Sequence, residues 1–151
     1  MEAGQVCPEL LILEEGLLRI FTTKSEVEFT YTFAGEGSFV TALSSFISGN
    51  PSHESIQFLE DSSCYVVTRE QLLNLYQKFP EVEKFGREFF ERLCAELIDR
   101  LIVMLSESAE ERYERILKES PQLVERVPQK LLARFLGITP QSLSRIRKHS
   151  P

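Results

Sequence analysis

The first part of the chain alternates apolar and polar residues at the period of β structure. The alternation is cleanest in residues 26–33, where one set of positions is apolar and the other polar: Val27, Phe29, Tyr31 and Phe33 against Glu26, Glu28, Thr30 and Thr32. Successive side chains of a strand point to opposite faces, so this pattern predicts a half-buried strand with the four apolar side chains on one face.

Four further short apolar runs predict strands at residues 10–13, 17–21, 55–59 and 64–67. Turn residues separate the runs, at 15–16, 23–25, 35–37, 49–51 and 60–62. A short helix is predicted at residues 41–48. Many short strands with regular turns are typical of a barrel or a jelly roll.

The pattern changes to helical spacing at Thr68. Thr68 and Gln71 form a capping box, in which each side chain meets a free backbone N–H of the first helical turn. Pro80 suits the first turn of the next helix, which is predicted to run from residue 81 to about 106, a length of about 39 Å. Ser108 and Glu111 form a second capping box, whose helix ends near residue 119.

The long predicted helix has two apolar stripes. One contains Phe85, Phe89, Leu93, Leu97, Leu101 and Met104, and the other contains Phe90, Cys94, Ile98 and Leu105. A helix with two apolar faces can pack on its own domain with one face and on a second copy with the other. We therefore predict a dimerisation helix; the alternative is a helix fully buried in a larger core.

Residues 129–148 predict two short helices, near 128–136 and 140–148, joined by a tight turn. Ala133 allows close helix approach, Gly137 suits the turn, and Thr139 and Pro140 suit the start of the second helix. The inward positions are apolar: Leu132, Leu136, Leu143 and Ile146. This pattern is typical of a DNA-binding helix-turn-helix, whose second helix enters the major groove.

Polar residues dominate the other face of that second helix. We predict that the residues that read bases are Gln141, Ser144 and Arg145, because Gln pairs with adenine and Arg with guanine. The residues predicted to contact the DNA backbone are Gln129, Thr139, Ser142, Arg147 and Lys148. The alternative is a helical hairpin with a solvated basic face. Two such units in a dimer would read half-sites roughly 34 Å apart.

Charge is distributed unevenly along the chain, whose net charge is −6. Eleven basic and 23 acidic residues precede position 126, so this part carries −12. The remainder has no acidic residue and six basic ones: Arg126, Lys130, Arg134, Arg145, Arg147 and Lys148. Such a basic end on an acidic body indicates binding to a polyanion such as double-stranded DNA.

Other function classes find little support. No apolar run approaches the roughly 20 residues that span a bilayer, and the first residues do not resemble a signal peptide, so we expect a cytoplasmic protein. The three cysteines lie far apart, so we expect no metal site and no cofactor. Two histidines and the absence of catalytic motifs argue against an enzyme.

Four stretches make the chain resemble the Crp–Fnr family of transcription regulators. They are residues 15–21, residues 33–39, residues 106–113, and residues 127–129 with 136–147. The last two are especially similar to the short regulators of this family common in Bacteroidetes. The resemblance implies an α+β fold in three parts: a cyclic-nucleotide-binding-type β-roll at 1–79, a dimerisation helix at 80–106 and a helix-turn-helix DNA-binding domain at 107–151.

Two departures from the family pattern change what the resemblance implies. Family members usually have roughly 40 more residues at the N-terminus. We therefore expect an incomplete roll, which would arise from a fragment, from a naturally shortened roll or from an internal start site. The phosphate-binding Gly-Glu and Arg-Ser pairs correspond to Gly37-Ser38 and Glu54-Ser55. An acidic residue there repels a cyclic phosphate, so we predict no cyclic AMP binding. Gly37, Ser38, Glu54 and Ser55 are then candidates for lining the pocket of an unknown effector.

The sequence thus favours a DNA-binding regulator that acts as a homodimer on a two-fold-symmetric operator, under the control of an effector in the roll. RNA polymerase is a candidate partner implied by the resemblance. The alternative is a ligand-sensing or protein-interaction module that does not bind DNA and uses its basic helical tail for another contact.

Overall fold

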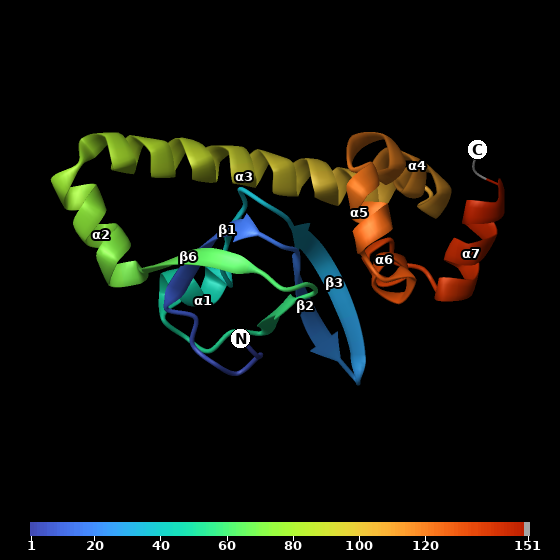
Figure 1. The fold of residues 1–151 in the computed structure, drawn as a ribbon, viewed down its shortest axis with the longest axis horizontal. Helices are drawn as coiled ribbons and strands as arrows, with labels where there is room; N and C mark the ends of the chain where they lie inside the picture. The colour runs from blue at the N-terminus through green and yellow to red at the C-terminus, as the bar shows by residue number, and fades with distance from the viewer. Residues whose placement is uncertain (150–151) are drawn as a thin grey trace.

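A computed structural model describes residues 1–149, so the last two residues of the predicted C-terminal domain lie outside it. The fold is mixed, with a β-roll followed by helices (Figure 1). The strands are β1 (Glu9–Glu15), β2 (Leu18–Lys24), β3 (Val27–Ala34), β4 (Phe39–Val40), β5 (Glu54–Phe58) and β6 (Ser63–Thr68). The helices are α1 (Leu43–Ser48), α2 (Arg69–Lys78), α3 (Pro80–Ser106), α4 (Ala109–Glu119), α5 (Pro121–Arg126), α6 (Gln129–Phe135) and α7 (Pro140–His149).

The roll consists of two antiparallel sheets, in the strand orders β4-β1-β6 and β3-β2-β5. Their facing apolar side chains, among them Leu13, Leu18, Ile20 and Ile56, form one core. The first residues of the chain run along β5: the backbone of Met1 both donates to and accepts from the backbone of Ile56. Five strands lie where the sequence predicts them. The short β4 was not predicted, because two residues are too few to show a period.

The predicted facing of β3 is wrong for its first half. Val27 and Phe29 are 48% and 49% exposed, whereas Thr30 is buried. The reason is an irregularity in the pairing with β2, where Ile20 lies opposite Thr32 but Phe21 lies opposite Thr30. The extra residue reverses the alternation along β3. Polar side chains therefore reach the outer face of this sheet, which the C-terminal helices cover.

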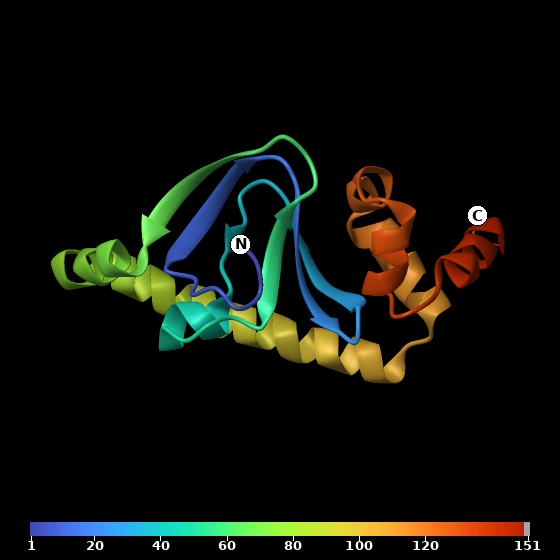
Figure 2. The ribbon, with the colours of Figure 1, turned by 90° about the horizontal axis from the view of Figure 1, so that it is seen from below.

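Helices α2 and α3 begin as predicted. Both side-chain hydrogen bonds of the Thr68–Gln71 capping box are present, and Pro80 is the first residue of α3. Gly86 lets the two helices approach closely: a Cβ atom there would lie 2.3 Å from the hydroxyl oxygen of Tyr76 and would force that side chain to move. Helix α3 is 27 residues long, passes along the roll and continues to the C-terminal helices (Figures 1 and 2).

The C-terminal helices pack around a second core. The Ser108–Glu111 capping box starts α4 as predicted. Helix α5 was not predicted. The sequence there indicates only a connection between Pro121 and Pro128, but Pro121 begins a helix of 6 residues. The second core is built from these helices and one residue of the roll: Leu17, Tyr113, Val127, Leu132, Ala133, Leu136, Leu143 and Ile146. Leu17 lies in the turn between β1 and β2, and Phe33 and Leu59 of the roll also pack against this core, so it joins the two parts of the molecule.

Candidate functional site

The turn between α6 and α7 has the local geometry that its sequence predicts. Gly137 adopts a left-handed backbone conformation with a φ of 73°, which an L-residue rarely tolerates. The Thr139 hydroxyl oxygen accepts a hydrogen bond from the Ser142 backbone N–H at 3.2 Å, which caps the first turn of α7. Ala133 and Leu143 have no exposed surface. Small and apolar side chains thus hold the two helices against each other.

The opposite face of α7 is polar and open to solvent. Gln141, Ser144, Arg145 and Lys148 are exposed, and their i, i+3, i+4, i+7 spacing puts them on one side of the helix. Arg147 is also exposed. Ser142 is half-buried, and its hydroxyl lies 3.0 Å from that of Thr139. Gln129 is exposed at the first position of α6. Four of these side chains share one side of α7, and the roles of all of them toward DNA stay predictions.

Apolar and aromatic contacts seat the C-terminal helices on the roll. The ring of Phe33 on β3 lies 5.0 Å from that of Phe135 on α6, centroid to centroid. The guanidinium carbon of Arg100 on α3 lies over the Phe135 ring, 4.1 Å from the ring centroid. Helix α6 is therefore held by β3 and α3 together, which fixes the position of α7 relative to the roll.

Ion pairs reinforce the same interface. Arg126 on α5 donates to the carboxylates of Glu36 and Glu60, at 2.8 Å and 2.9 Å. Arg134 on α6 pairs with Glu28 on β3, and Glu28 also pairs with the buried Arg19 at 2.9 Å. The partners of Arg126 and Arg134 lie at least 66 positions away in the sequence. No local pattern could therefore reveal these pairs.

Acid should weaken the Arg126 contacts. Hydrogen bonds from Arg126 lower the pKa of Glu36 from 4.5 to about 2 and also lower the pKa of Glu60. A carboxyl whose pKa is depressed in the folded state stabilises it above the unfolded pKa, and the stabilisation is lost as the pH falls through the folded pKa. We expect the melting temperature to fall as the pH is lowered from about 4.5 to about 2. The fall should be smaller in Glu36→Gln, which has no carboxyl to protonate at this position, than in the control Glu15→Gln. Equal slopes in a pH series of thermal melts would contradict this.

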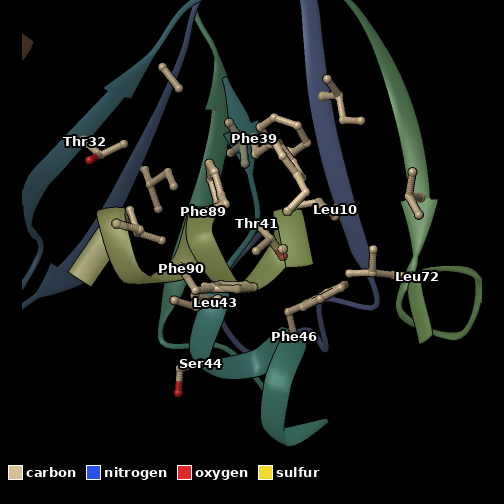
Figure 3. Close-up of a pocket in the computed structure, with 18 of the residues that line it drawn as sticks. Leu10, Thr32, Phe39, Thr41, Leu43, Ser44, Phe46, Leu72, Phe89 and Phe90 are labelled. Carbon is tan, nitrogen blue, oxygen red and sulfur yellow. The ribbon is translucent and has the colours of Figure 1, made fainter. Parts of the chain in front are cut away.

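A cavity of about 580 Å³ lies between the roll, α1, α2 and α3. Its lining is mostly apolar and includes Leu10, Phe39, Phe46, Leu72, Phe89 and Phe90 (Figure 3). This size is in the range of pockets that hold small molecules. The lining comes from all six strands and from α1, α2 and α3, so the cavity could not be read from the sequence. Helix α3 contributes the first four residues of the first predicted apolar stripe, Phe85, Phe89, Leu93 and Leu97, and also Phe90 of the second stripe.

One carboxylate lines this cavity. The Tyr31 hydroxyl donates to Glu54 Oε1 at 2.6 Å, while Glu54 Oε2 is buried and has no hydrogen-bond partner within residues 1–149. Burial, and then the hydrogen bond to Glu54, raise the pKa of Tyr31. Of the four residues proposed from sequence to line an effector pocket, Glu54 lies at the cavity.

The other three residues proposed for the pocket are not among those that line it. The backbones of Gly37 and Ser38 are hydrogen-bonded to that of Leu13 at the end of β1. The Ser55 hydroxyl accepts from the backbone N–H of Ala3. The residues that line the cavity in this region are instead Phe39 and Val40 of β4 and Thr41 after it, just beyond the predicted Gly37-Ser38 pair.

The roll has a counterpart among known protein families. Residues 1–79, more than half of the chain, match the cyclic nucleotide-binding domain. The chain belongs to the cyclic nucleotide-binding domain family. No curated protein matches it. The match covers the six strands, α1 and α2, and it ends just before the first residue of α3.

Solved structures extend the likeness beyond the cyclic nucleotide-binding domain to the helices. FixK2 of Bradyrhizobium japonicum is 18% identical with a TM-score of 0.76, over 97% of this chain and 75% of that one. The c-di-GMP responsive global regulator CLP of Xanthomonas campestris is 18% identical with a TM-score of 0.69, over 98% and 79%. A protein of Eubacterium rectale assigned to the Crp/Fnr family of transcriptional regulators is 16% identical with a TM-score of 0.72, over 95% and 69%. Regulators of the Crp/Fnr type share this fold.

No helix within residues 1–149 combines the length and apolar character that crossing a membrane requires.

Proposed function

We propose that the chain is a transcription regulator that binds double-stranded DNA through α7 as a homodimer. The observation that carries this is the division of α7 into a buried apolar side and an exposed polar side. Leu143 and Ile146 pack into the second core, whereas Gln141, Ser144 and Arg145 face solvent on a stretch without acidic residues. The fold shared with Crp/Fnr-type regulators supports the same function.

The second half of α3 supports a dimer. Its exposed apolar side chains are Leu97, Ile98, Leu101, Ile102, Met104 and Leu105. Leu105 is 79% exposed and Leu101 is 58% exposed. A contiguous apolar face of this kind marks an interface in a water-soluble protein. A second copy packed on it across a two-fold axis would present two α7 helices to one DNA duplex, as a palindromic operator requires.

The cavity supports control by an effector. Helix α3 lines the cavity between Val82 and Leu97 and carries the proposed dimer face from Leu97 onward, so the two surfaces meet at Leu97. A molecule in the cavity that shifts α3 would therefore move the two recognition helices relative to each other. Contact with RNA polymerase stays a prediction of the family resemblance.

The test is selection from a random double-stranded DNA pool with the purified full chain at moderate salt. Recovery of a two-fold-symmetric motif, with half-sites about one helical turn apart, would establish the dimeric regulator. Binding through phosphates weakens steeply with salt, by roughly 0.9 log units per contact for each tenfold change in salt. A folded protein that retains no DNA at any salt would instead favour a protein-interaction module.

Two substitutions on α7 should separate base reading from backbone contact. Arg145→Ala is expected to cost about 1–3 kcal/mol on the selected operator and little on random DNA, because a bidentate contact with guanine is lost. Lys148→Ala should weaken both DNAs by a similar factor, because phosphates carry no sequence information. Binding of each variant to both duplexes by fluorescence anisotropy gives the comparison. If Arg145→Ala lowers affinity equally for both DNAs, the assignment of base reading is wrong.

A further inference from the structure

The side chains that line the cavity of the roll restrict which small molecules it can bind. The side chains that line it are almost all aliphatic or aromatic, and no Lys or Arg is among them. Its one charged side chain is Glu54; the other polar groups are the hydroxyls of Tyr31, Thr32, Thr41, Ser44 and Tyr76. A phosphate in this cavity would meet a carboxylate and no cation, so a nucleotide is disfavoured by like-charge repulsion.

The carboxylate of Glu54 has unused capacity for hydrogen bonds. An ionised carboxylate offers about four acceptor sites, and the Tyr31 hydroxyl fills one of them on Oε1. Oε2 is buried without a partner within residues 1–149. A buried acceptor without a donor destabilises the empty protein, and it strengthens the binding of any ligand that supplies the donor.

We propose that the cavity binds a small molecule with an apolar body and one protonated amine, and that the ammonium group pairs with Glu54. The apolar body would lie against the leucines and phenylalanines of the lining, and the ammonium N–H groups would supply the donor that Oε2 lacks. The charge of −12 on residues 1–125 raises the local concentration of cations around the roll. The inference rests on the proposed function only in naming this ligand as the effector.

The position of Glu54 connects the cavity to the C-terminal helices. Tyr31, which donates to Glu54, is close enough to Arg100 for the positive charge of Arg100 to act on the Tyr31 hydroxyl. Arg100 lies over the ring of Phe135 on α6. An ammonium group at Glu54 would repel Arg100 and draw away the Tyr31 hydrogen bond. Both effects act on a side chain that helps to seat α6.

The experiment is titration calorimetry of the full chain, without DNA, against matched ligands that differ in the head group. The ligands are hexylamine, 4-phenylbutylamine and 1-naphthylmethylamine, each beside the alcohol with the same apolar body, with 4-phenylbutyrate and cyclic AMP as anions. We expect at least one amine to bind with one molecule per chain and at least tenfold more tightly than its alcohol. The two anions should show no saturable binding. The proposal is overturned if no amine binds more tightly than its alcohol.

Two variants locate the site. Glu54→Gln keeps the shape and the acceptor for Tyr31 but removes the charge, and it should reduce the affinity for the amine at least tenfold. Glu14→Gln is the matched control, because Glu14 accepts a hydrogen bond from Tyr65 on the exposed outside of the roll, at 3.1 Å; it should leave the affinity unchanged. Equal loss in both variants, or none in Glu54→Gln, would overturn the site.

Two readouts keep the outcomes separate. Should Glu54→Gln fail to fold by circular dichroism, the comparison of amine with alcohol on the unaltered chain still decides. DNA binding is measured on the same protein without ligand. A chain that binds the amine but not DNA would refute the proposed function and support the ligand site. A chain that binds DNA but no amine would support the proposed function and overturn the ligand site.

Discussion

Replacement of Leu101 by glutamate is expected to convert a dimer into a monomer and to abolish binding to a palindromic operator. Leu101 lies in the middle of the exposed apolar face of α3. Burial of a leucine contributes about 1.5–3 kcal/mol, and the two-fold axis makes every substitution count twice. Loss of two buried leucines and the approach of two like charges together should exceed about 4 kcal/mol, which weakens dimerisation by about a thousandfold or more.

Sedimentation equilibrium of the variant at several concentrations measures this directly. The matched control is Leu73→Glu, because Leu73 is also an exposed leucine but lies on α2. It should leave the dimer and DNA binding intact. A Leu101→Glu protein that sediments as a dimer would show that the apolar face of α3 has another use. A monomer that still binds the full operator with unchanged affinity would show that DNA binding does not depend on the dimer.

Leu17→Ala should loosen the C-terminal helices, although Leu17 belongs to the roll in sequence. Leu17 and Leu18 are neighbours and both are at most 2% exposed, but they point into different cores. Leu18 packs among the residues between the two sheets, whereas Leu17 packs against Tyr113, Val127 and the α6–α7 pair. Removal of a fully buried leucine costs about 2–5 kcal/mol in either core. The two variants should therefore be destabilised similarly but in different places.

Hydrogen exchange followed by peptide mass spectrometry tells the two variants apart. In Leu17→Ala, amide protection should fall mainly in α4, α5 and α6, and the affinity for DNA should fall with it. In Leu18→Ala, the loss should lie mainly in β1, β2 and β5. If both variants lose protection in the same peptides, the two cores unfold as one unit and the molecule has no separable parts.

The features that the sequence predicts are those set by neighbours along the chain. The Thr68–Gln71 box joins residues three apart, and Gly137, Thr139 and Pro140 each have a steric role within one turn. Local geometry leaves such positions few alternatives, so the starts of α2, α4 and α7 could be predicted closely. The exposed face of α7 follows for the same reason, since helical periodicity fixes which residues share a side.

The features that the sequence does not predict depend on partners far along the chain. The alternation of residues 26–33 is regular, but one extra residue in the β2–β3 pairing reverses it and buries Thr30. Arg126 and Arg134 carry the same basic signature as Arg147, and only the fold shows that glutamates of the roll engage them. The cavity is equally non-local, because Glu54 meets Tyr31 across 23 positions.

The ion pairs on the roll change what the basic tail can do for affinity. Of the six basic residues from position 126 onward, Arg126 and Arg134 already neutralise carboxylates of the same molecule. Counterion release on a duplex depends on the cations that reach phosphates, and each contributes about 0.9 log units of affinity per tenfold change in salt. Two arginines engaged within the chain would make its proposed affinity for DNA less dependent on salt than its composition suggests, by about 1.8 log units per tenfold change in salt. These two arginines resemble DNA contacts in the sequence, but in the folded chain they join the C-terminal helices to the roll.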